Sequence, residues 1–97
     1  MREVLSDDDL QSLLADLPRW RRVGPKLVRE AEFAAYLDGL RFVEGVAQEA
    51  ERRDHHPDLT LGYRRVKIEL TSHDAGGITR RDADLARWIE ARLSRSA

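Results

Sequence analysis

The chain has 97 residues, enough for one domain of modest stability that would gain from association between subunits. Seventeen basic and eighteen acidic side chains leave a formal charge of −1, which lacks the basic surplus that binding to a phosphate backbone uses. No apolar run approaches the roughly 20 residues of a membrane span. Cysteine is absent, which excludes disulfides, thiolate nucleophiles and cysteine-based metal sites. The first ten residues lack the basic start and apolar centre of a secretory signal. We therefore expect a single cytoplasmic domain over residues 1–97, without direct contact with nucleic acid or membrane.

The first predicted element is a helix over Asp7–Asp16. Ser6 supplies an N-cap hydroxyl, and Asp7, Asp8 and Asp9 place negative charge at the positive end of the helix dipole. Leucines then recur at helical spacing until Pro18 stops the helix. The acidic run is therefore expected to be a solvated helix start.

Two strand-like segments follow, residues 20–23 and Lys26–Glu32, with Gly24-Pro25 between them as a turn. A long helix ending near Arg53 is predicted next, because apolar residues recur at steps of three and four. These residues are expected to face the core: Phe33, Tyr36, Leu37, Leu40, Val43, Ala47 and Ala50.

Phe42 projects from nearly the opposite side of this helix, with Gly39 and Val46 beside it. An aromatic side chain there is either an isolated exposed residue or half of a helix–helix contact between subunits. We favour the contact, because a domain of this size gains from extra burial.

After Asp54-His55-His56-Pro57 comes a loop and a further extended region, in which Val66, Ile68 and Leu70 alternate with polar residues. Gly76-Gly77 breaks the chain. Thr79 and Asp82 then resemble a capping box with Asp in place of Glu, ahead of a last helix marked by Leu85, Ile89 and Leu93. The order is helix, two strands, helix, one or two strands, helix. It predicts an α+β domain, an antiparallel sheet with helices on one face.

The three histidines, His55, His56 and His73, lie within 19 residues, beside predicted helix and strand ends. Histidine both gives and takes a proton near neutral pH, so such a cluster favours general acid–base chemistry. Glu51 lies four residues before His55 and would be its neighbour if the helix continued, although such pairs are often plain surface salt bridges.

Three other interpretations stay open. Each histidine could simply cap a helix or make a local hydrogen bond. Three imidazoles could hold a zinc ion, although adjacent histidines usually diverge and no clear second set of carboxylates is visible, so no metal is expected. Ser72 could join a histidine and an aspartate in a triad, but no nucleophile-elbow pattern surrounds it.

The residues around these histidines closely resemble the signature of the pterin-4a-carbinolamine dehydratase family, whose members include dimerisation cofactors. The matching segments are Glu51-Arg52-Arg53-Asp54-His55-His56-Pro57, then Tyr63, Thr71-Ser72-His73-Asp74, Gly77-Ile78-Thr79 and Asp82. The resemblance extends upstream to Trp20 and to Leu27-Val28-Arg29-Glu30.

This resemblance implies a four-stranded antiparallel sheet with three helices in the order α-β-β-α-β-β-α. It implies dimers or tetramers, with Phe42 and Val46 as candidate contacts on the long helix. The implied reaction removes water from a 4a-hydroxytetrahydropterin, such as 4a-hydroxytetrahydrobiopterin, to give a quinonoid dihydropterin, and it needs one acid, one base and no cofactor.

The resemblance also implies roles for individual residues. His55, His56 and His73 would carry protons, and Glu51, Asp54 and Asp82 would orient the imidazoles or bind the pterin. The remaining residues implied to contact the pterin are Trp20, Pro57, Ser72, Asp74, Ala75 and Arg81.

Two alternatives accompany this hypothesis. Relatives act as a dimerisation cofactor for a homeodomain transcription factor or resemble assembly chaperones for Rubisco, so a non-catalytic binding module on the same fold is the first. A scaffold would not need the intact histidine set. A pterin-linked role outside amino-acid hydroxylation, with the same chemistry on another substrate, is the second.

Overall fold

The structure is a computed structural model that describes residues 3–95. Its elements run in the order α-β-β-α-β-β-α, which confirms the predicted order. Their bounds are α1 Asp7–Asp16, β1 Arg21–Val23, β2 Lys26–Glu32, α2 Tyr36–Arg53, β3 Asp58–Leu61, β4 Arg65–Leu70 and α3 Arg80–Arg95.

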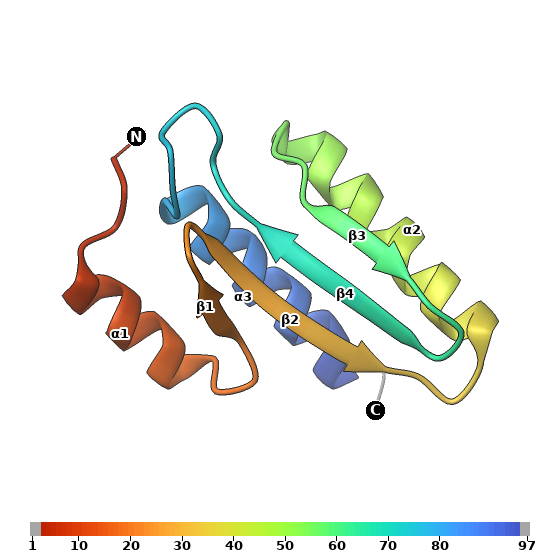
Figure 1. Cartoon of the computed structure of the whole chain (residues 1–97). Coiled ribbons are helices and arrows are strands. Elements are labelled where there is room, and N and C mark those ends of the chain that lie inside the picture. Colours follow the sequence, from red (N-terminus) through yellow and green to blue (C-terminus); the bar gives the residue numbers. More distant parts are fainter. Residues whose placement is uncertain (1–2, 96–97) are drawn as a thin grey trace.

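The four strands form one antiparallel sheet in the order β1-β2-β4-β3, so β2 and β4 are central. The register sets Leu27 opposite Leu70 and Ala31 opposite Val66, and all four side chains are buried. Figure 1 shows α3 running behind the central strands and α2 lying along β3. Apolar residues of all three helices join those of the strands in one core, which confirms an α+β fold with helices on one face.

The local signals at the start of the chain act as predicted. The Ser6 hydroxyl oxygen accepts a hydrogen bond of 3.1 Å from the Asp9 backbone N–H, and Leu10 and Leu13 of α1 are buried. Gly24 has a φ of +58°, the sign that a tight hairpin turn needs at its first central position. The hairpin therefore forms between Arg21–Val23 and Lys26–Glu32, one residue shorter than predicted at its start.

The predicted core face of the helix is confirmed at Phe33 and Val43, which pack against the core, and at the buried Ala50, but it is wrong over the first turns of α2. Phe42 and Val46, expected at a contact between subunits, are only 5% and 0% exposed and belong to the core. Tyr36, Leu37 and Leu40, expected in the core, are 47%, 54% and 37% exposed. The first turns of the helix thus present to water large apolar residues that the sequence pattern assigned to the interior, and Ala47 is exposed as well.

Gly39 explains this orientation. An ideal Cβ at Gly39 would lie 3.2 Å from Leu61 Cδ1 and 3.5 Å from Val66 Cγ2, so the helix backbone lies close to the sheet at this position. Residues three and seven positions later, Phe42 and Val46, share that side of the helix. The ring of Phe42 also packs against Phe33, with centroids 5.3 Å apart.

In residues 3–95, no helix combines the length and the apolar composition that crossing a bilayer demands.

Candidate active site

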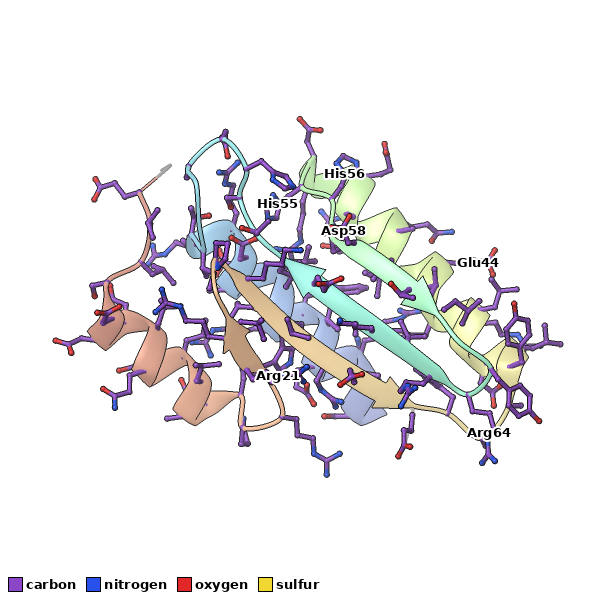
Figure 2. All side chains as sticks on the ribbon, viewed as in Figure 1. Arg21, Glu44, His55, His56, Asp58 and Arg64 are labelled. Carbon is purple, nitrogen blue, oxygen red and sulfur yellow. The ribbon has the colours of Figure 1, made fainter. Side chains whose placement is uncertain are left out.

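The candidate site lies at one end of the sheet, where three segments meet. These are the connection between α2 and β3, the loop between β4 and α3, and the first turn of α3 (Figure 1). His55 and His56 occupy the first segment, at the end of α2 (Figure 2), and His73 occupies the second. The fold therefore brings the three histidines to the same end of the molecule.

His55 is buried and bound to a fully buried carboxylate. Its Nε2 lies 2.6 Å from Oδ1 of Asp82, in the first turn of α3. The His55 backbone N–H donates to the Ala50 carbonyl at 3.1 Å, which fixes the chain just beyond the helix end. A carboxylate in this position orients the imidazole.

His56 is exposed, and its Nε2 lies 3.0 Å from Glu51 Oε1. The expectation that Glu51 would neighbour His55 is therefore wrong. The reason is that α2 ends at Arg53 and the chain turns sharply at Asp54, which swings His55 inward and leaves His56 beside Glu51. Because both side chains are exposed, this pair contributes little to stability.

His73 lies on a tight loop that follows β4. Ser72 and Gly77 pair across its base, where the Ser72 N–H donates to the Gly77 carbonyl at 2.9 Å. Gly76, with a φ of +76°, supplies the left-handed conformation that closes the loop. His73 is exposed near the tip, and its side chain forms no hydrogen bond with any residue from 3 to 95. The imidazole is therefore accessible to a ligand.

The hydroxyl groups of Ser72 and Thr79 link the loop after β4 to the first turn of α3. Ser72 Oγ lies 2.8 Å from both Asp82 Oδ2 and Thr79 Oγ1, and the Thr79 N–H donates to Asp82 Oδ2 at 2.9 Å. The last bond confirms the predicted capping contact between Thr79 and Asp82. Ser72 is buried and its hydroxyl is committed, so it is not free to contact a ligand as the resemblance implied. The link from Thr79 to Ser72 was not predicted, and the capping box was its signal in the sequence.

Among the remaining predicted site residues, Pro57 and Ala75 are half-buried and lie next to His56 and Asp74 in the chain. Asp74 Oδ1 accepts a bond of 2.7 Å from Arg81 Nη2, which raises the pKa of Arg81 and ties the His73 loop to α3.

Trp20 does not lie at the end of the sheet that holds the three histidines. It is 3% exposed, and its indole N–H donates to Glu90 Oε1 at 2.8 Å, two turns or about 12 Å along α3 from Asp82. Tyr63 lies on the turn between β3 and β4, at the other end of β3 from His56. The structure therefore gives no support to Trp20 as a wall of the site.

Asp54 carries the positive φ, +51°, that closes the end of α2, and its side chain forms no hydrogen bond within residues 3–95. The left-handed conformation costs free energy for any residue with a Cβ, and glycine avoids that cost. We expect Asp54→Gly to raise the free energy of unfolding by about 0.5–1 kcal/mol, as measured by urea denaturation. A decrease would show that the Asp54 carboxylate stabilises the site and would contradict this prediction.

A cavity of about 610 Å³ lies elsewhere, and the residues that line it include no histidine. Two of the arginines that line it are paired with carboxylates, Arg29 with Glu90 and Arg41 with Asp38. It offers no proton carrier near neutral pH, so the histidine end is the better candidate for acid–base chemistry. Within residues 3–95, no three His, Asp or Glu side chains are grouped so that they could hold a metal ion.

Comparison with known proteins identifies the family. The family model described as pterin 4 alpha carbinolamine dehydratase matches residues 3–92. The chain belongs to this family. A relative in Thermosynechococcus vestitus, provisionally named pterin-4-alpha-carbinolamine dehydratase, is 44% identical over 89 residues, which cover 92% of this chain and 94% of the relative. A relative of the same provisional name in Thermomicrobium roseum is 48% identical over 85 residues, covering 88% and 91% of the two chains.

Solved structures show the same fold. A transcriptional coactivator/pterin dehydratase from Brucella melitensis superposes with a TM-score of 0.88 at 28% identity, covering 92% of this chain and 97% of that one. A pterin dehydratase-like protein described as a RuBisCO assembly factor in the alpha-carboxysome superposes with a TM-score of 0.62 at 22% identity, covering 75% and 84%. The second likeness shows the fold alone.

Proposed function

We propose that this protein is a hydro-lyase that removes water from a 4a-hydroxytetrahydropterin and releases a quinonoid dihydropterin. The observation that carries the proposal is the buried pair of His55 and Asp82 at the end of the molecule that also holds His56 and His73. Membership of the pterin 4 alpha carbinolamine dehydratase family supports it.

The reaction needs one group to take a proton from a ring nitrogen and another to protonate the departing hydroxyl. The imidazole of His55 is held by the buried carboxylate of Asp82, and that of His56 by the exposed carboxylate of Glu51. The His73 side chain is exposed near the tip of its loop and forms no hydrogen bond within residues 3–95. We propose that these imidazoles divide the two tasks, while Pro57, Asp74, Ala75 and Arg81 contact the pterin and no cofactor takes part.

A stopped-flow dehydration assay on a chemically generated 4a-hydroxytetrahydropterin tests this function. The observed rate is measured against protein concentration, with catalysis by the buffer extrapolated to zero buffer. We expect a rate that rises linearly with the protein and far exceeds the spontaneous one. A slope of zero with folded protein would overturn the proposal.

No contact among residues 3–95 favours the alternative of a non-catalytic binding module. The protein described as a RuBisCO assembly factor shares the fold at 22% identity, which does not extend its role to this chain. A scaffold would have no use for a histidine held on a fully buried carboxylate, whereas an acid–base enzyme would.

We also propose that the chain self-associates through the exposed apolar side chains of α2, Tyr36, Leu37 and Leu40, in place of Phe42 and Val46. Tyr36 and Leu37 lie in the first turn of α2 and Leu40 lies one turn later, so the three form a surface that a second copy could bury.

A charged side chain in that surface is expected to separate the copies. Leu37→Glu should reduce the mass measured by sedimentation equilibrium toward the 11.2 kDa of one chain, with unchanged helix content by circular dichroism. Gln48→Glu, an exposed position three turns further along α2, is the matched control and should keep the wild-type mass. A wild-type protein that is already monomeric, or a Leu37→Glu variant that keeps its mass, would contradict the proposed surface.

We propose that residues 1–97 act as one domain in the cytoplasm. Residues 6–16 belong to this domain, because they form a capped helix whose leucines pack into the core. Fractionation of cells that express the full chain would check the location, and recovery in an exported or membrane fraction would contradict it.

A further inference from the structure

The carboxylate of Asp82 is fully buried, and both of its oxygens are occupied. Oδ2 accepts the Thr79 backbone N–H at 2.9 Å and lies 2.8 Å from Ser72 Oγ, while Oδ1 lies 2.6 Å from His55 Nε2. A backbone N–H only donates, so Oδ2 must be an acceptor there. The proton between Ser72 and Asp82 therefore comes from the Ser72 hydroxyl.

The directions of the other hydrogen bonds follow from this one. A serine hydroxyl has a single proton, which Ser72 gives to Asp82, so in its 2.8 Å contact with Thr79 Oγ1 it must accept. Thr79 therefore donates to Ser72, and its own oxygen accepts the Arg81 backbone N–H at 3.2 Å. The result is a directed chain of hydrogen bonds from Thr79 through Ser72 to Asp82.

The chain of hydrogen bonds determines which nitrogen of His55 carries the proton. A carboxylate accepts at both of its oxygens, so with Asp82 as a carboxylate Nε2 of His55 donates to Oδ1. A neutral imidazole has one N–H, so Nδ1 is left with a lone pair. Nδ1 of His55 forms no hydrogen bond with any residue from 3 to 95. Among these residues, Nε of Arg81 is the fully buried side-chain atom that lacks a hydrogen-bond partner. Nδ1 of His55 is not such an atom, so it is at least partly exposed to solvent.

We propose that Ser72 and Thr79 are positioning residues that act through Asp82 to hold the proton of His55 on Nε2, so that Nδ1 exchanges protons with the substrate. This deepens the proposed function and rests on it for the identity of the substrate. In the dehydration, the Nδ1 lone pair takes the proton of the ring N–H. The electrons of that bond form the ring C=N bond, the C4a–O bond breaks, and the departing hydroxyl takes a proton from an acid to leave as water.

The position of the proton can be tested without any substrate. Long-range ¹H–¹⁵N correlation spectra of uniformly labelled protein, recorded above the titration range of the imidazoles, distinguish the two neutral tautomers of each histidine. We expect His55 to show a protonated Nε2 and an unprotonated Nδ1 in the wild type. A proton on Nδ1 would overturn the proposal, whatever the activity of the enzyme.

Variants test the role of the hydroxyl groups. Ser72→Ala and Thr79→Val should move the His55 signals toward a mixture of tautomers and lower kcat for dehydration about 10- to 100-fold. Thr79→Ser keeps the hydroxyl and should keep both the spectrum and the rate. The matched control is Thr71→Val, because the Thr71 hydroxyl donates to the Pro25 carbonyl at 2.7 Å, outside this network.

The outcomes separate this inference from the proposed function. Unchanged tautomers in both Ser72→Ala and Thr79→Val would overturn the positioning role, even with full dehydratase activity. The expected spectra in a wild type that does not accelerate dehydration would leave the positioning role standing and overturn the function instead. If Ser72→Ala fails to fold, the comparison of Thr79→Val with Thr79→Ser carries the test.

Discussion

The His55→Ala variant is expected to lose both activity and stability. Removal of a general acid or base lowers kcat by about 10²- to 10⁴-fold. The same change leaves the Asp82 carboxylate fully buried without one of its donors, which should lower the free energy of unfolding by about 1–3 kcal/mol. Stopped-flow dehydration and urea denaturation measure the two effects separately.

His73→Ala is the matched comparison for this prediction. The His73 side chain is exposed and forms no hydrogen bond within residues 3–95, so its removal should leave the unfolding free energy within about 0.5 kcal/mol. If His73 carries a proton, kcat should fall in the same range as for His55→Ala. A His55→Ala variant with wild-type kcat would contradict histidine acid–base catalysis at Asp82, and a His73→Ala variant with wild-type kcat would remove the loop from the mechanism.

The elements whose ends are marked by capping or turn residues could be predicted closely. Ser6 before an acidic turn, Gly24-Pro25 between two extended segments, and Thr79 three residues before Asp82 each fix a boundary through contacts within a few residues. Such signals depend little on the rest of the fold, and the structure confirms them.

The orientation of α2 could not be predicted, because the helix carries apolar residues on two sides. Periodicity counts such residues and favoured the side with more of them. The sheet selects the other side, since Leu61 and Val66 need the close backbone approach that Gly39 allows. That requirement comes from residues 22 and 27 positions away in the chain, so it is not visible in a helical pattern.

The candidate site also combines local features that could be predicted with long-range contacts that could not. The histidine cluster and the capping contact of Asp82 are local features, and the sequence indicates both. The partner of His55 is Asp82, 27 residues away, rather than Glu51, because a residue with positive φ at Asp54 redirects the chain. Trp20 is bound to Glu90, 70 residues away, a pairing that only the packing of α3 against the sheet creates.

Glu90 supports the second prediction with a large effect. Arg29 is buried, and its Nε and Nη2 donate to the two carboxylate oxygens of Glu90 at 2.9 and 3.3 Å. Glu90→Gln keeps an acceptor for the indole N–H of Trp20 but leaves the buried guanidinium without its counter-charge. Since breaking a buried pair on one side costs about 3–5 kcal/mol, and Glu90 is partly exposed, we expect the free energy of unfolding to fall by about 3 kcal/mol at neutral pH.

The double variant Arg29→Met/Glu90→Gln is the control. It removes the unpaired cation while it keeps the acceptor for Trp20, so it should recover most of the stability that Glu90→Gln loses. Urea denaturation of the wild type and both variants measures these differences. A double variant as unstable as Glu90→Gln would show that the loss comes from packing around position 90 rather than from the buried charge of Arg29.

The pH dependence of the same comparison identifies the charge interaction. The hydrogen bond from Arg29, above all, holds the pKa of Glu90 below its ordinary value near 4.5. The folded chain therefore binds this proton less readily than the unfolded chain, and the stabilisation is present above that ordinary value and is lost as the pH falls through the lowered pKa. The difference in unfolding free energy between the wild type and Glu90→Gln should accordingly shrink in acid, because a protonated Glu90 is as neutral as glutamine. A difference that stays constant from neutral to acidic pH would mean that Glu90 stabilises the fold by its shape and hydrogen bonds, and that the charge of Arg29 is compensated elsewhere.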